Sequence, residues 1–329
     1  MPDTIRITLL ATLLLNLGTG AARACEAPPP AVHDIDANSY YIDQHHSVID
    51  PVRKARNVAA TKPVDEFLDA VARHASSYQA RPSDREEARC GLQWLSAWAH
   101  QDAMLGKMTT SQSYYTRKWA LGGLALSYAR LRPAATDADR KAIDAWLQSL
   151  ANATMVHADA GKGARNNHYY WEGLAVAATG AVTGDQRQLA WGSKVFDHAM
   201  SQVAPDGSLP LEMERAAKAL HYHSFAVQPL VMLASVLDVQ SPQLDQLVRF
   251  TLQGIADPSV IEKATGIAQE RLKGTPSWKI VYDRHTAGAV IPAMPGMPVT
   301  SGAPNLWQPR MGGDLRLPNP LEHAAKKQS

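Results

Sequence analysis

Two short segments of the chain concentrate side chains that can bind anions and move protons. The first is RNNHYYW, residues 165–171, followed at once by the apolar stretch GLAVAATGAV. This pattern is typical of a helix start with Asn166 or Asn167 as its N-cap, where unpaired N–H groups favour an anion. A structural interpretation also fits this segment taken alone, with His168 as a satisfied polar residue and Trp171 in the core.

The second segment is DGSLPLEMERAAKALHYHSFAVQPLVMLA, residues 206–234. On one continuous helix, Arg215, Lys218 and Tyr222 would share a narrow stripe. Burying a guanidinium, an ammonium and a phenol together is costly without an acidic partner. The stripe therefore indicates either a site for an acidic ligand or, because charged side chains usually face water, an ordinary solvated face.

The histidines of the second segment do not have metal-binding spacing. His221 and His223 flank Tyr222, and residues at i and i+2 diverge on a helix, whereas metal-binding helices use H-E-x-x-H. No cysteine cluster accompanies them. The sequence predicts no metal site and no cofactor.

The chain that must position these segments has a helical pattern from residue 62 onward. Apolar residues recur at helical spacing in PVDEFLDAVARHASSYQ, GLQWLSAWAHQDAM, TRKWALGGLALSYARL and DADRKAIDAWLQSLANATMV, and alternating strand patterns are almost absent. We expect roughly eight to ten helices joined by short turns, one of them capped by Asp137, packed as antiparallel neighbours. Such hairpins can form a bundle, a superhelical stack or a closed toroid.

Two parts of the chain lack this pattern. Residues 25–60 are irregular, and NSYYIDQHHSVIDP within them is expected to be a loop that covers a cleft. The tail after residue 265 is rich in Pro and Gly and is expected to wrap over the helical body as loops. No linker is visible between residues 60 and 260, so we expect a single domain over residues 25–329.

The first 24 residues are typical of a secretory signal, with Arg6, the apolar run ITLLATLLLNLGTG and an A-x-A site that ends at Ala24. Cleavage there would leave Cys25 at the mature N-terminus, although AARAC is a poor lipid-attachment motif. The other cysteine is Cys90, and a lone pair of thiols in an oxidising compartment usually pairs. We therefore expect a Cys25–Cys90 disulfide rather than two free thiols, and a periplasmic or secreted protein.

Charge and hydropathy argue against two classes of partner. A formal net charge of only +2 gives no basic footprint for nucleic acid. The N-terminal apolar run is too short for a comfortable membrane span, and no later stretch is expected to qualify. We expect a monomer that binds neither nucleic acid nor a membrane, and that meets an acidic ligand in a local cleft.

The two segments, together with three others, resemble a known family. The matching pieces occur in order between residues 90 and 315 and are CGLQWLSAWAHQDAM, RKWALGGLALSYARL, NNHYYW, DGSLPLEMERAAKALHYHSFAVQPLVMLAS and PRMGGDL. They resemble the alginate lyases of polysaccharide lyase family five, whereas residues 25–60 match poorly and residues 265–305 depart from the family. The resemblance implies an all-α fold, an incomplete α/α toroid of antiparallel helical hairpins with irregular ends, and an anionic polysaccharide substrate.

The resemblance also implies roles for particular residues. The four active-site positions of the family, an amide, an imidazole, a guanidinium and a phenol, fall on Asn167, His168, Arg215 and Tyr222. The substrate-stacking tryptophan falls on Trp171, and Arg310 in PRMGGDL is a candidate contact to the substrate carboxylate. Further candidates for substrate binding are Tyr115, Lys162, Lys218 and His221.

The implied reaction is β-elimination of a uronate polymer, which must remove a weakly acidic proton from C5. Asn167, Arg215 and the helix start would neutralise the neighbouring carboxylate and stabilise the charge that moves onto it. Tyr222 would act as base and then as acid, provided that nearby positive charge lowers its pKa from about 10. His168 would either polarise the carboxylate or hold Tyr222 deprotonated.

Stereochemistry limits the substrate. In β-mannuronate, H5 and O4 lie on the same side of the ring, so one residue can serve both. Glucuronate differs only at C2, so polyglucuronate and hyaluronan are further expected substrates, whereas guluronate presents H5 on the opposite face. Because unperturbed histidines titrate near neutrality, His168, His221 and His223 predict a substrate preference that moves with pH.

Two other functions remain open. A glycoside hydrolase on the same fold would use paired carboxylates, for which Glu172, Asp206, Glu212 and Glu214 are available. A non-catalytic polysaccharide-binding protein would use the same aromatic and basic residues. An unsaturated, ultraviolet-absorbing product separates a lyase from a hydrolase. Retained binding with lost turnover in Tyr222→Phe separates an enzyme from a binding protein.

Overall fold

The computed structural model describes residues 25–161, 165–287, 300 and 302–322. The expected signal peptide, residues 1–24, and Lys162 lie outside these residues. The described chain is predominantly helical, as expected, and the short strands β1 (Trp307–Gln308) and β2 (Gly313–Asp314) pair antiparallel. Its helices are α1 (Pro51–Ala80), α2 (Arg85–Ala99), α3 (Ser111–Leu131), α4 (Asp137–Ala160), α5 (Asn167–Thr183), α6 (Gln186–Ser201), α7 (Pro210–Met213), α8 (Ala219–Leu237), α9 (Pro242–Ala256), α10 (Ser259–Thr265) and α11 (Lys279–Thr286). Single 3₁₀ turns are η1 (Arg132–Ala134), η2 (Ala216–Lys218) and η3 (Pro309–Met311).

Capping side chains define where the helices start. Asp50 caps α1 by accepting hydrogen bonds from two N–H groups of the first turn, and Pro51 fits this turn because its missing N–H is not needed there. The helix therefore begins at residue 51, and the prediction of irregular chain up to residue 60 is wrong. Thr136, rather than Asp137, caps α4 through a reciprocal capping box.

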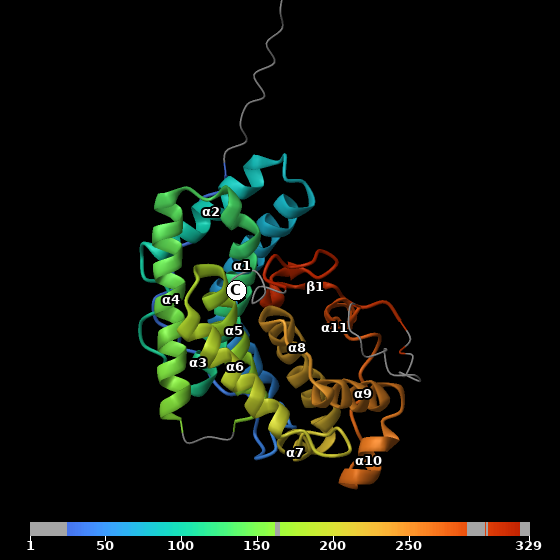
Figure 1. Ribbon diagram of the computed structural model, residues 1–329. Helices are drawn as coiled ribbons and strands as arrows, with labels where there is room; N and C mark the ends of the chain where they lie inside the picture. The colour runs from blue at the N-terminus through green and yellow to red at the C-terminus, as the bar shows by residue number, and fades with distance from the viewer. Residues whose placement is uncertain (1–24, 162–164, 288–299, 301, 323–329) are drawn as a thin grey trace, which may run out of the picture.

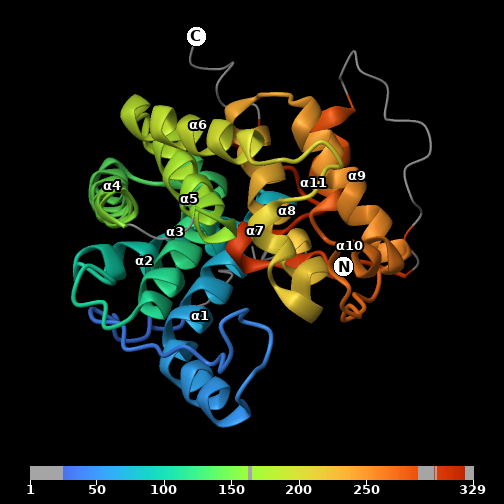
Figure 2. The same ribbon diagram turned by 90° about the horizontal axis from the view of Figure 1, so that it is seen from below.

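The helices pack in pairs around α5. Short turns join α1 to α2, α3 to α4, α5 to α6 and α8 to α9, and each pair is in contact (Figure 1). α5 itself contacts α3, α4, α6 and α8, and nearly all of its side chains are buried. Seen from below, α3, α5 and α8 lie on the inside, with α4 and α6 outside them (Figure 2). The start of α5 is therefore held from several sides at once.

The C-terminal segment lies against the helical body. η3 packs on α3, and β2 packs on α1. A Cβ at Gly123 would lie 2.3 Å from the carbonyl oxygen of Pro309, so glycine permits this close approach. The approach places Arg310 beside α3. The same tail contains the helix α11, so the expectation of loops throughout it is wrong there, and the stretch 288–299 lies outside the described residues.

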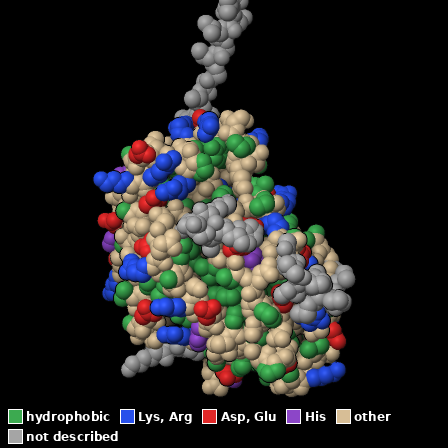
Figure 3. Space-filling view, viewed as in Figure 1, with side chains coloured by type: hydrophobic (Ala, Val, Ile, Leu, Met, Phe, Trp, Pro, Cys, Tyr) green, Lys and Arg blue, Asp and Glu red, His purple; other side chains and the backbone are tan. Residues whose placement is uncertain are grey.

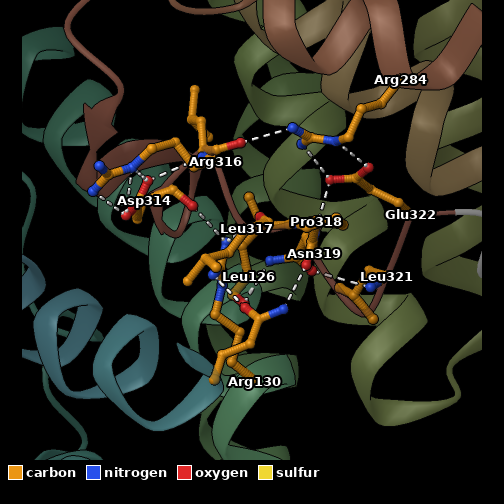
Figure 4. A network of polar contacts seen from close by, with 12 residues as sticks. Leu126, Arg130, Arg284, Asp314, Arg316, Leu317, Pro318, Asn319, Leu321 and Glu322 are labelled. Atoms are coloured by element: carbon orange, nitrogen blue, oxygen red, sulfur yellow. Dashed lines mark hydrogen bonds and ion pairs between the residues drawn. The ribbon is translucent and has the colours of Figure 1, made fainter. Parts of the chain in front are cut away.

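Polar contacts hold the end of this segment (Figure 4). Arg130 of α3 is 3% exposed and donates to the carbonyl oxygens of Asp314 and Leu317, both at 3.3 Å. Arg284 of α11 pairs with the carboxylate of Glu322 at 2.9 Å. These contacts join α3, α11 and the C-terminal residues into one packed unit.

The N-terminal residues are tied to α2. Cys25 and Cys90 form the expected disulfide, which joins positions 65 residues apart. The indole N–H of Trp94 donates to the carbonyl oxygen of Glu26 at 2.8 Å. The chain then continues along the helical body to the loop that precedes α1.

One described stretch, Ala216–Leu237, is long and apolar enough by composition to cross a membrane, which the sequence analysis did not anticipate. Within the protein, 78% of this window is buried, so the stretch is the central helix of a packed core. On the face shown in Figure 3, basic and acidic side chains are interspersed rather than separated by sign.

Replacing Cys25 and Cys90 together by Ser should lower the free energy of unfolding by about 2–4 kcal/mol, because the unfolded chain regains the entropy of a long open loop. Urea unfolding followed by circular dichroism measures the change. The disulfide lies away from the cavity described below, so activity before unfolding should be retained. An unchanged unfolding midpoint would show that the disulfide contributes nothing to stability.

Candidate active site

A cavity of about 710 Å³ lies between the N-terminal loop, α1, α3, the start of α5 and α8. Six of the candidate residues from the sequence line it, namely Tyr115, His168, Arg215, His221, Tyr222 and Arg310. They come from α3, α5, the chain before α8, α8 itself and η3. The fold thus brings together side chains that are almost two hundred positions apart in the sequence.

The start of α5 forms one wall of this cavity. Asn166 is the N-cap, because its side chain accepts a hydrogen bond from the N–H of His168 at 3.1 Å. Asn167 is fully buried behind it, and its backbone N–H and Nδ2 donate to the carboxylate of Glu212 at 2.8 and 3.0 Å. Its Oδ1 has no hydrogen-bond partner within the described chain. A buried oxygen in this state is costly, and such atoms often belong to binding sites.

Arg215 lies in a break between two helices. α7 ends before it, α8 begins after η2, and Ala216 between them has a φ of +48°. The expectation of one continuous helix through this segment is therefore wrong. The break directs Arg215 toward Glu212, with Nε 3.6 Å from the carboxylate, and places its guanidinium 5.0 Å from the ring centre of Tyr222.

The same break separates Lys218 from the stripe in which it was expected. Its Nζ lies 2.6 Å from the carboxylate of Glu270, beyond α9. Lys218 is absent from the described lining of the cavity. A direct contact between Lys218 and a ligand in this cavity has no geometric support.

Tyr222 lies beneath the N-terminal loop, which covers the cleft as expected. Its hydroxyl donates to the carbonyl oxygen of His46 at 3.2 Å. Burial raises the pKa of Tyr222, Tyr41 raises it further, and the positive charge of Arg215 opposes only part of this. The expectation of a lowered pKa is wrong for the free protein, because desolvation of the phenolate outweighs the nearby cation.

His168 faces the cavity as a neutral imidazole. Its ring stacks on Tyr115, with ring centres 3.6 Å apart and planes within 10°. Its Nδ1 is buried and has no hydrogen-bond partner in the part of the chain that the structure describes. Burial lowers the pKa of His168 well below its usual value, and the cations Lys118 and Arg215 lower it further.

The other two histidines also resist protonation. His221 lines the cavity, and burial lowers its pKa. His223 is fully buried, and its Nε2 accepts a hydrogen bond from the N–H of Leu209 at 2.9 Å. Burial lowers the pKa of His223 to about 4. The premise of titration near neutrality is therefore wrong for His168 and His223, because desolvation disfavours their charged forms.

Trp171 and Arg310 border a second cavity of about 560 Å³, which shares Arg310 and Phe225 with the first. Trp171 is 1% exposed and packs against Phe225, so it presents little ring surface for stacking on a sugar. The guanidinium of Arg310 lies 4.1 Å above the ring of Trp119 and 3.9 Å from the carboxylate of Asp65. Arg310 therefore lies where the two cavities meet.

Two buried residues at the site were not assigned these roles from the sequence. Glu212 contacts both Asn167 and Arg215. The sequence feature that could have indicated this contact is an acidic residue three positions before Arg215. Lys118, within an apolar helical segment, pairs with Glu172 behind His168. No local pattern indicated that this lysine faces inward.

Comparison with known proteins agrees with this description. The chain matches the family model described as Alginate lyase over residues 34–261. It is 40% identical over 325 residues to a polysaccharide lyase of Stenotrophomonas maltophilia (strain K279a), covering 95% of both chains. It is 31% identical over 312 residues to an alginate lyase of Pseudomonas syringae pv. syringae (strain B728a), covering 82% of both. Alginate lyase A1-III from Sphingomonas species A1, in a form complexed with a tetrasaccharide, has a similar fold, with a TM-score of 0.74 at 22% identity over 92% of this chain and 86% of that one.

The fold is thus the expected α/α toroid, and the class of protein is a polysaccharide lyase. The chain belongs to the alginate lyase family. Its similarity to the Stenotrophomonas protein extends over nearly the whole of both chains.

Glu212→Gln should lower kcat/KM by about five- to a hundredfold, since leaving a buried donor or acceptor unsatisfied costs about 1–3 kcal/mol. The substitution keeps the shape of the side chain but replaces an acceptor oxygen, to which Asn167 donates, by an amide N–H. The matched control is Glu214→Gln, an exposed carboxylate of the same segment, which should behave as the wild type. Steady-state rates on polymannuronate check both, and equal activity of the two variants would contradict this role for Glu212.

Proposed function

We propose that this protein cleaves β-1,4-linked polyuronates, above all poly-β-D-mannuronate, by β-elimination that leaves a 4,5-unsaturated uronate end. The observation that carries the proposal is the meeting of His168, Arg215 and Tyr222 in one cavity at the buried start of a helix. The names of its relatives, which are alginate and polysaccharide lyases, support the same chemistry.

The substrate carboxylate would dock against the start of α5. N–H groups at a helix start and the guanidinium of Arg215 favour an anion there. The unpartnered Nδ1 of His168 can, as an N–H, donate to the carboxylate, whereas the unpartnered Oδ1 of Asn167 can only accept and would need a carboxyl group that carries a proton. Neutralising the carboxylate stabilises the charge that moves onto it when C5 loses its proton.

Tyr222 would carry the proton from C5 to the leaving oxygen. When the substrate enters, the hydroxyl would give up its hydrogen bond to the carbonyl of His46 and lose its proton to bulk water, and the resulting phenolate would lie beside Arg215. The phenolate takes H5, the C4–O4 bond breaks as the C4–C5 double bond forms, and the phenol returns the proton to O4. Because its pKa is depressed, His168 is a poor base for Tyr222, so we assign it to the carboxylate rather than to deprotonation.

The hydrolase alternative has little geometric support. Asp65 is the one carboxylate in the described lining of the larger cavity, and the adjoining cavity adds Glu66 and Asp69. Asp69 already accepts hydrogen bonds from Arg73 and Trp307, both at 2.7 Å, so a free pair of carboxylates set against a sugar is not evident among these residues. Glu172 pairs with Lys118, and Glu212 is bonded to Asn167. The Tyr222→Phe variant described below separates an enzyme from a protein that only binds the polymer.

We further propose that the protein acts outside the cytoplasm as a single-domain monomer without a cofactor. The disulfide is supporting evidence for an oxidising compartment. One continuous hydrophobic cluster extends from Ile35 to Leu321, and the cavity is built within one chain. Fractionation of the producing cells tests in which compartment the protein is found.

Purified protein should produce ultraviolet-absorbing ends from polymannuronate and from polyglucuronate, with hyaluronan as a further substrate. Polyguluronate should react at least about tenfold more slowly, because its H5 lies on the face away from Tyr222. A rise in reducing ends without a rise in ultraviolet absorbance would show a hydrolase instead.

Tyr222→Phe should bind polymannuronate as the wild type does and lose turnover by at least about a thousandfold, since the phenol supplies both proton transfers. Isothermal titration calorimetry and the ultraviolet assay measure the two properties separately. Turnover within tenfold of the wild type would exclude Tyr222 as the acid and base.

A further inference from the structure

A buried lysine lies directly behind the imidazole of the site. Lys118 of α3 is 1% exposed, and its Nζ donates to the carbonyl oxygen of His168 at 2.8 Å. The same Nζ lies 3.1 Å from the carboxylate of Glu172, one turn further along α5. Burying an ammonium and a carboxylate costs more than apolar side chains of the same volume would. The pair therefore contributes little to stability, and its ammonium is bonded directly to the backbone of His168.

The same lysine also contacts the ring on which His168 stacks. Tyr115 lies one turn before Lys118 on α3, and Nζ is 4.4 Å from the centre of its ring. That ring stacks on His168 at 3.6 Å. Because Nδ1 of His168 lacks a partner in the described chain, ring stacking and the anchored carbonyl are the contacts that orient the imidazole.

We propose that Lys118, paired with Glu172, is a positioning residue for His168, which it fixes through the backbone of α5 and keeps neutral through its charge. This inference rests on the proposed place of His168 in the lyase site. Burial lowers the pKa of Lys118 to about 8, and the carboxylate of Glu172 opposes this effect and so helps to keep the lysine charged. A neutral His168 can donate a hydrogen bond to a carboxyl group without removing the proton that the reaction must move.

Several titratable or charged groups face His168 from the elements around it. They are Lys118 and Tyr115 of α3, Glu172 of α5, Arg215 before α8, Tyr222 of α8 and His46 of the N-terminal loop. Burial is the main cause of the lowered pKa of His168, and the charge of Lys118 is the next. Removing that charge should raise the pKa of His168, so that protonation inactivates the site at a higher pH.

The test is Lys118→Met, which keeps most of the apolar side chain and removes the terminal ammonium and its charge. The pKa of His168 should rise by roughly one to two units, as expected for the loss of a unit charge at short range. Nuclear magnetic resonance titration of the histidine rings, with the His168 signal identified from a His168→Gln variant, measures this without substrate. The ratio of kcat/KM at low pH to that at pH 8 should be smaller in the variant than in the wild type, because the acid limb of the profile moves with the pKa of His168.

Two controls separate this role from a structural one. Lys118→Arg keeps the cation and should leave the His168 titration in place, whatever its effect on rate. Arg130→Met removes another buried cation of α3, more than three turns away, and should lower stability without moving the pH profile. If Lys118→Met does not fold, Lys118→Gln with Glu172→Gln keeps hydrogen bonds without charge, and should shift the titration in the same direction.

An unchanged His168 titration in a folded charge-free variant would overturn the proposal, as would an equal shift in Lys118→Arg. The titration requires no substrate, so it is independent of the proposed function. If the wild type released no unsaturated product, the proposed function would be contradicted. The effect of Lys118 on His168 would still be decided by the titration.

Discussion

The site depends on one buried carboxylate that joins two parts of the chain. Glu212 accepts hydrogen bonds from the backbone and side chain of Asn167 and lies within 3.6 Å of Arg215. Burial raises the pKa of Glu212, and Asn167 and Arg215 oppose this effect. Without this side chain, the start of α5 and the break before α8 would present unpaired N–H groups and a cation to each other. The carboxylate fixes their separation, and the cavity forms in front of it.

Burial determines the proton state of the groups in that cavity. Desolvation raises the pKa of Tyr222 and lowers that of His168, so the phenol is protonated and the imidazole neutral in the free protein. The charge of Arg215 lowers both pKa values, so it favours the phenolate and disfavours the imidazolium. The reactive phenolate is thus a state that the bound substrate must help to create. The loop whose His46 carbonyl contacts Tyr222 would separate the phenol from water until a sugar takes its place.

Much of this arrangement follows from the sequence, and the rest depends on tertiary contacts. Helical periodicity and the N-cap motif around Asn166 predicted the all-α fold and the start of α5, because both are local properties. The break at Ala216 was missed, since a positive φ at alanine is imposed by packing rather than by local preference. Motif spacing predicted that Trp171 and Lys218 bind the substrate. It could not show that Trp171 is buried or that Lys218 pairs with Glu270. Likewise, the direction of a pKa shift depends on desolvation, which spacing does not reveal.

The most direct test of this account is a crystal structure of the Tyr222→Phe variant with a mannuronate tetrasaccharide. The account predicts one uronate carboxyl group within hydrogen-bond distance of Asn167, His168 and Arg215, with C5 and O4 of that sugar facing position 222. A chain bound with its carboxyl groups directed only toward Arg310 and solvent, and with C5 turned away from position 222, would contradict it.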